Sequence, residues 1–263
     1  MKSDLSDHSP SQPALLTRRA FTTQSVHALL TFSLIQTLCR RELFAASVNP
    51  QMASWLKDVN QLAESLKHQT LDQKVWQTKI ETLFRQVDLP ELLKFIDFDQ
   101  IDKRANPPKN GAQSIRFDYP KAEGAPTKLV FGQQIFALRK DRSVVPHGHN
   151  NMATAFIILK GEFQGKHYDR LEDEKDHMII KPTIDRKFTP GECSSVSDYK
   201  DNVHWFKALT GPAYIFNLHI LDVSPANEKR TGRLYVDPNG EKVAGGRIRA
   251  RRIDDEEAHR LYG

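Results

Sequence analysis

The chain lacks the residues that several common architectures need. Its 263 residues include only two cysteines, Cys39 and Cys193, too few for a disulfide framework or a four-cysteine zinc site. No stretch approaches the roughly 20 consecutive apolar residues of a membrane-spanning helix, so we expect no stable membrane insertion unless an N-terminal signal stays uncleaved. The formal net charge of +5 falls short of the dense basic face of a nucleic-acid-binding domain. Any metal site would therefore have to use histidine ligands. Nucleic acid is not an expected partner.

Residues 1–49 have the pattern of a targeting segment and not of a folded domain. A moderately apolar stretch covers residues 26–38, small residues follow at 45–47, and the apolar stretch is preceded by Thr17-Arg18-Arg19-Ala20-Phe21. This order resembles a twin-arginine export signal. The resemblance implies export, to the periplasm if the source is bacterial. The alternative is an amphipathic surface helix on a cytoplasmic protein.

Residues 50–105 show a helical period and predict a helical extension before the main domain. Apolar residues recur on one stripe at Trp55, Leu56, Val59, Leu62 and Leu66, which is the spacing of a buried helix face. Thr70-Leu71-Asp72-Gln73 has the spacing of a capping box and predicts the start of a second helix. A third helix is predicted from Asp88, with a proline in its first turn. Residues 106–111 read as a connector.

Residues 113–223 change to short β runs separated by turn residues. The runs lie near 129–138, 143–149, 154–159, 162–168, 177–181, 186–188, 193–197, 203–209 and 213–221. This number of short strands favours a sandwich or a closed barrel that can hold one small ligand in its mouth. Residues 224–263 are predicted to form a C-terminal hairpin and charged tail, with the hairpin turn at Asp237-Pro238-Asn239-Gly240.

A candidate metal site centres on two histidines in one predicted strand. Side chains alternate along a strand, so His147 and His149 point to the same face. His204, on a later predicted strand, is the leading candidate for a third ligand. Three imidazoles suit Fe(II), Zn(II), Ni(II) or Cu(II) and leave coordination positions open. The alternative is that all three are polar residues of an empty barrel.

The same histidines carry a resemblance to a known superfamily. His147, His149, Gly161 and His204 are similar to the two motifs of the cupins, whose fold is a double-stranded β-helix barrel. Thr154 stands where the usual cupin glutamate ligand would be. The stretches 145–169 and 202–210 are more closely similar to the cysteamine dioxygenase and plant cysteine oxidase family of thiol dioxygenases.

This narrower resemblance implies an iron enzyme. In that family three histidines and no carboxylate hold the metal, so His147, His149 and His204 would bind Fe(II), with another divalent transition metal as the alternative. The partners would be O₂ and a small thiol, which is oxidised to a sulfinate. Two other functions remain open: a three-histidine cupin dioxygenase acting on a diketone or phenolic substrate, and a non-catalytic metal-binding or ligand-binding cupin. The oligomeric state is also open.

Three further residues are candidates for substrate binding. Gln133 and Gln134 alternate along their strand, so we expect only one of them to face the barrel interior, where it could orient a histidine or bind substrate. Arg139 could pair with a substrate carboxylate. Tyr168 is a third candidate, with packing as its alternative role. Cys193 has no spacing that fits a metal ligand, and we expect a buried, unreactive thiol there.

Overall fold

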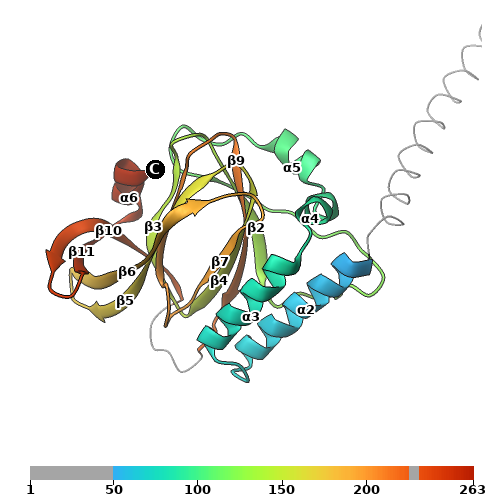
Figure 1. Ribbon diagram of the computed structural model, residues 1–263, viewed down its shortest axis with the longest axis horizontal. Coiled ribbons are helices and arrows are strands. Elements are labelled where there is room, and N and C mark those ends of the chain that lie inside the picture. Colours follow the sequence, from blue (N-terminus) through green and yellow to red (C-terminus); the bar gives the residue numbers. More distant parts are fainter. Residues whose placement is uncertain (1–49, 225–230) are drawn as a thin grey trace, which may run out of the picture. The chain divides into compact units, whose positions relative to one another are not determined.

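The helical extension comes first in the fold. A computed structural model describes residues 50–224 and 231–263, so the predicted targeting segment at 1–49 lies outside the described residues. Four helices precede the strands (Figure 1), with bounds α2 Pro50–Lys67, α3 Gln73–Gln86, α4 Leu89–Phe95 and α5 Phe98–Arg104. None of the helices in the described parts of the chain is both long and apolar enough to cross a bilayer.

The helix starts are set by aspartates. Asp72, directly before α3, has extended backbone and accepts hydrogen bonds from the Lys74 and Val75 amides, which stabilises the first turn. The predicted capping box that starts at Thr70 is therefore wrong by two residues, because only the residue next to the first turn can aim an oxygen at its free amides. The predicted start at Asp88 is confirmed, since its side chain accepts from the Glu91 amide at the head of α4.

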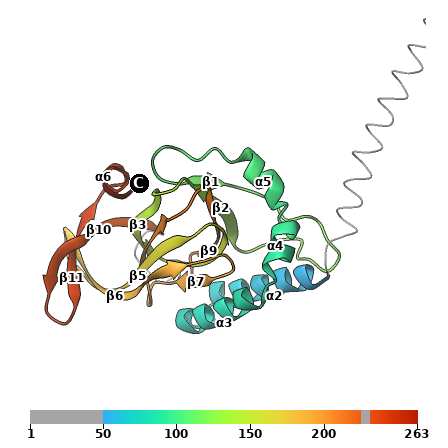
Figure 2. The ribbon, with the colours of Figure 1, turned by 45° about the horizontal axis from the view of Figure 1, so that its top comes forward.

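The strands form two antiparallel sheets, and a short helix ends the chain. One sheet has the order β1-β2-β9-β4-β7, and the other closes into a six-stranded ring, β10-β11-β6-β5-β8-β3, as Figure 2 shows from a second side. Their bounds are β1 Gln113–Ile115, β2 Gly132–Leu138, β3 Ser143–Asn150, β4 Met152–Lys160, β5 Phe163–Asp173, β6 His177–Phe188, β7 Cys193–Val196, β8 Val203–Ala208, β9 Ala213–Leu221, β10 Gly232–Val243, β11 Arg247–Ile253 and helix α6 Asp255–Tyr262.

The helices cover the outer face of the five-stranded sheet. Helices α2 and α3 lie along it (Figures 1 and 2), and their apolar stripes join one core with the outward side chains of β4 and β9. Trp76, Ile80 and Phe84 of α3 are at most 1% exposed, and burying each such side chain stabilises the fold by about 1.5–3 kcal/mol. Gln77 of α3 donates to the Ser195 carbonyl of β7 and accepts from the hydroxyl of Ser197, just after that strand.

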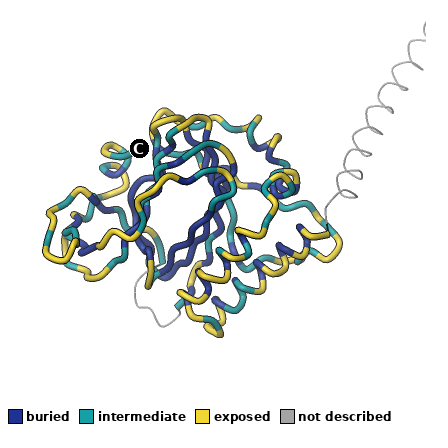
Figure 3. The backbone as a smooth tube through the Cα atoms, viewed as in Figure 1, coloured by how far each residue is buried: buried dark blue, intermediate teal, exposed yellow. Residues whose placement is uncertain are grey.

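The inner face of the same sheet packs on the six-stranded sheet. A second apolar cluster fills this space, with Phe156 and Ile158 from β4 facing Phe163 and Phe206. Strand β4 therefore contributes to a core on each of its faces, as its continuous apolar run predicts, and Figure 3 shows its tube in the buried colour. A third, smaller cluster fills the six-stranded ring, on the face of that sheet turned away from the metal candidates.

This architecture confirms the predicted mainly β class, with a closed antiparallel barrel and helices toward the N-terminal part. Ring closure depends on β10 and β11, which follow the predicted barrel, because β10 pairs with β3 and β11 with β6. The predicted hairpin turn at 237–240 is wrong. Strand β10 continues past it through a register shift, and the chain turns at 244–246, where Gly245 and Gly246 both adopt positive φ.

One further break predicted from the sequence does not exist. The runs at 177–181 and 186–188 belong to a single strand, β6. Pro182 interrupts the expected pattern because it has no amide hydrogen to donate, but it lies opposite Tyr168 where the pairing with β5 shifts register. A proline is tolerated at such a bulge.

Candidate metal centre

Two strands of the six-stranded sheet bring three histidines together. His147 and His149 lie on β3, and His204 on β8 is the direct cross-strand partner of His147. The ring centroids are 5.1 Å apart for His147 and His149, 4.3 Å for His147 and His204, and 5.0 Å for His149 and His204. Each residue offers a nitrogen within 4.8 Å of those of the other two, and all three are buried.

The hydrogen bonding leaves ring nitrogens available for a metal. A carbonyl oxygen can only accept, so the His147 Nδ1–H donates to the Val145 carbonyl at 2.8 Å, and its Nε2 keeps a lone pair. That Nε2 is buried and has no partner among the described residues, as is also true of Nδ1 of His204. Buried polar atoms without partners are uncommon in native proteins, and a cation held by the three rings would account for these.

Burial keeps the three imidazoles neutral. Burial first, and the positive charge of Arg233 second, lower the pKa of His149 to about 3. Burial also lowers the pKa values of His147 and His204 well below the usual range. Neutral imidazole is the form that binds metals, so at neutral pH no proton has to be displaced.

No carboxylate of the described residues joins the three histidines. Thr154, at the position of the usual cupin glutamate, is buried on β4 with its Oγ1 3.4 Å from His149 Nδ1. Of the described residues that line the adjoining cavity, Asp118 alone is acidic, and its side chain is exposed. A divalent metal here would therefore keep its full charge on three neutral ligands.

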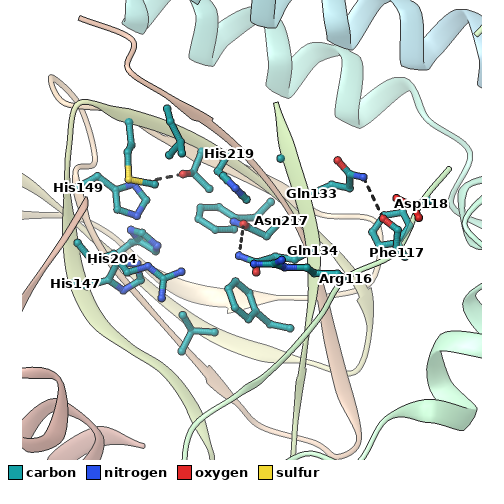
Figure 4. A pocket seen from close by; sticks show the side chains of 18 residues that line it. Arg116, Phe117, Asp118, Gln133, Gln134, His147, His149, His204, Asn217 and His219 are labelled. Atoms are coloured by element: carbon teal, nitrogen blue, oxygen red, sulfur yellow. Dashed lines mark hydrogen bonds between the residues drawn. The ribbon is translucent and has the colours of Figure 1, made fainter. Parts of the chain in front are cut away.

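The histidines form one end of a cavity of about 440 Å³ between the two sheets. In Figure 4 they gather on the left, and Arg116, Gln133 and Asp118 lie on the right. The Gln134 amide donates to the Asn217 side chain at 3.2 Å. The walls are mixed, with apolar side chains from Phe117, Phe136, Val144, Met152, Phe156 and Leu221 and polar or charged ones from Arg116, Asp118, Gln133, Gln134, Thr154, Asn217, His219 and Arg233.

The predicted substrate-binding residues do not all lie at the cavity. Both glutamines border the cavity. Alternation along β2 places Gln134 on the inner face with Phe136, and Gln133 on the outer face with Ile135, where its side chain donates to the Phe117 carbonyl. Arg139 lies outside the cavity, beyond the end of β2, and donates to the Pro107 carbonyl at 2.7 Å.

Tyr168 also lies away from the cavity, in the core of the six-stranded ring. Its neighbour on β5, His167, pairs with His204 and shares the face of the metal candidates. Alternation then sends Tyr168 to the opposite face. Cys193 is buried at 7% exposure, as expected, and burial raises the pKa of its thiol to about 11.

The sequence did not point to five polar or charged cavity residues: Arg116, Asp118, Asn217, His219 and Arg233. Alternation along β9 could have placed Asn217 and His219 on one face. Nothing local could have found Arg233, which reaches the cavity only because β10 pairs with β3, more than 80 residues earlier in the sequence.

Comparisons with known proteins give the following matches. No protein-family model matches the chain, and no curated protein does. Among solved structures, an uncharacterized conserved protein with a double-stranded β-helix domain from Klebsiella pneumoniae is 11% identical, with 51% of this chain and 85% of that chain covered and a TM-score of 0.33. Oxalate oxidase in complex with the substrate analogue glycolate is 16% identical, with 51% and 60% covered and a TM-score of 0.35.

The 11S globulin procruciferin from Brassica napus is 12% identical over 36% of this chain, with a TM-score of 0.28. The chain spans only 21% of that protein's length. Matches of this kind carry no argument about family or function, which must come from the site.

Proposed function

We propose that this protein is an iron-dependent dioxygenase that oxidises a small thiol to a sulfinate. The observation that supports it is the set of three buried, neutral imidazoles, beside which the described part of the chain places no carboxylate. The similarity of residues 145–169 and 202–210 to thiol dioxygenases points the same way. Imidazole ligands and open coordination positions suit Fe(II).

Some residues of the site would hold the metal, and others shape the cavity beside it. His147, His149 and His204 would hold the iron. When bound, the iron would supply a dipositive centre that favours a thiolate over a thiol and can bring it next to O₂. The overall reaction needs no other reductant, because both oxygen atoms pass to the sulfur, which is oxidised to the sulfinic level.

Groups next to the histidines would hold them in orientation. The Val145 carbonyl fixes the tautomer of His147, so that Nε2 is the free nitrogen. Partners of this kind commonly hold ligating histidines in place. Phe156, whose ring centroid is 5.0 Å from that of His204, excludes water from that side and strengthens the electrostatic interactions of the site.

The test is metal content together with oxygen uptake. Protein purified from its native compartment should contain iron, and it should consume O₂ when given cysteine, cysteamine or another small thiol. His204→Ala should lose both the metal and the activity, whereas the control His68→Ala, on an exposed turn after α2, should keep both. The proposal fails if iron-loaded protein consumes no O₂ with any thiol. Zinc or no metal in the native protein would favour a binding protein without catalysis.

The apolar part of the cavity wall supports a second candidate. Phe136, Phe156 and Met152 offer a surface for an aromatic or enolisable substrate such as a phenol or a diketone. Oxygen uptake with such compounds, and not with thiols, would favour this alternative.

We also propose that residues 1–49 direct export through the twin-arginine route, which carries folded proteins and would allow the metal to be loaded first. The support is the sequence of residues 17–21. Replacing Arg18 and Arg19 together by lysine should hold the protein in the cytoplasm, as fractionation would show. Unchanged export would contradict the proposal.

A further inference from the structure

We propose that the substrate carries an anionic group, a carboxylate in the simplest case, and that Arg233 binds it at the cavity mouth while the opposite end of the substrate reaches the metal. This rests on the proposed function for the reacting end of the substrate. It names a substrate class, small acids, and a residue that selects it.

Strand pairing places Arg233 on the side of the metal candidates. Arg233 on β10 is the direct antiparallel partner of His149 on β3, and Tyr235 is the partner of His147. Directly opposed residues project from the same face of a sheet. The ring centroids of Tyr235 and His147 are 6.1 Å apart, which agrees with this.

The guanidinium of Arg233 reaches across the cavity. Its Cζ lies 5.8 Å from the ring centroid of Phe136, a residue of the opposite sheet. Arg233 and Phe136 both line the cavity. The charge therefore lies at the opening between the sheets, within range of a molecule that also touches the histidines.

Arg233 differs from the neighbouring arginines in its ion pairing. Most arginines on and beside its hairpin pair with carboxylates: Arg170 with Asp173, Arg249 with Glu174, Arg251 with Glu257 and Arg252 with Asp173. No such pair involves Arg233 within residues 50–224 and 231–263. A planar guanidinium with five donors matches a carboxylate in two-point contact.

The charge around the cavity favours an anion. Arg116 is a second cation of the lining and Asp118 the one acid among the described lining residues. With a dipositive metal at the other end, the cavity carries an excess of positive charge. An ammonium group would be repelled there, whereas a carboxylate would be attracted.

A matched pair of thiols tests the inference. 3-Mercaptopropionate and cysteamine have the same chain length and opposite end charges. Calorimetric titration of the full-length, iron-loaded protein without oxygen should show the acid binding at least 10-fold more tightly. Arg233→Gln should weaken binding of the acid about 10- to 100-fold and leave cysteamine binding unchanged or stronger, and Arg233→Lys should fall between.

The control is Arg247→Gln, which removes the same charge from the same hairpin but outside the cavity, and it should change neither affinity. Circular dichroism and iron content should match wild type for each variant. Equal binding of the two thiols, or an unchanged affinity in Arg233→Gln, would overturn the inference. If the acid binds preferentially but oxygen uptake is absent with both thiols, the dioxygenase proposal fails and the anion site stands.

Discussion

Acid should destabilise the protein through His167, a buried histidine that is not one of the three proposed ligands. It is fully buried, with its ring 5.5 Å from that of Phe206 and its Nδ1 without a partner among the described residues. Burial, followed by the charges of nearby cations, Arg186 first, lowers the pKa of His167 to about 3. The side chain therefore stays neutral in the folded protein at any pH near neutral.

The direction of this pH effect follows from the difference in the pKa of His167 between the folded and the unfolded chain. In the unfolded chain the pKa of this side chain returns to about 6.5, so below pH 6.5 the unfolded state binds a proton that the folded state does not. Stability is lost as the pH falls from 6.5 toward the folded pKa. For one such group the free energy of unfolding drops by about 1.4 kcal/mol between pH 7.5 and pH 5.5.

The perturbation is His167→Leu, which replaces the imidazole by an apolar side chain of similar size. Urea unfolding of chelator-treated protein, followed by tryptophan fluorescence, gives the free energy of unfolding at the two pH values. The loss on acidification should be about 1.4 kcal/mol smaller in the variant than in wild type. Any packing cost of the leucine is the same at both pH values and cancels from this comparison.

The control is the same substitution at His68, which lies exposed on the turn after α2. His68→Leu should lose as much stability on acidification as wild type does. If His167→Leu also shows the wild-type loss, then the buried imidazole takes up a proton in the folded state, and the reasoning from burial is refuted.

Three further predictions concern single residues. Thr154→Glu would place a carboxylate beside the histidines and reduce the metal's effective charge, so thiol-dependent oxygen uptake should fall at least 10-fold while metal content is kept. Gly161→Ala should cost about 2 kcal/mol or more in urea unfolding, because Gly161 has a φ of +81° and an added Cβ would lie 2.7 Å from Cβ of Ala213. Gln77→Ala should cost about 1–3 kcal/mol in the same assay, because it removes the hydrogen bonds of Gln77 with the Ser195 carbonyl and the buried Ser197 hydroxyl; no loss of stability would contradict either estimate.

Much of the fold follows from local pattern. The helical period of residues 50–105 and the short β runs after it indicate the fold class. Gly161 marks a turn because glycine adopts its positive φ without the steric cost that other residues incur. Local pattern does not define where individual helices and strands begin and end. The start of α3 depends on which oxygen meets the first free amides, and the continuity of β6 depends on a bulge at Thr183, beside Pro182, which only the pairing of β6 with β5 reveals.

The sequence by itself determined the three histidines and the missing carboxylate, because alternation along a strand puts His147 and His149 on one face and Thr154 is read directly from its position. Only the tertiary structure decided what surrounds them. It removed Arg139 and Tyr168 from the candidates, and it brought Arg233 beside His149. The physical reason is that pairing between strands distant in the chain is fixed by the whole barrel, so the contents of its cavity cannot be read from any one stretch of residues.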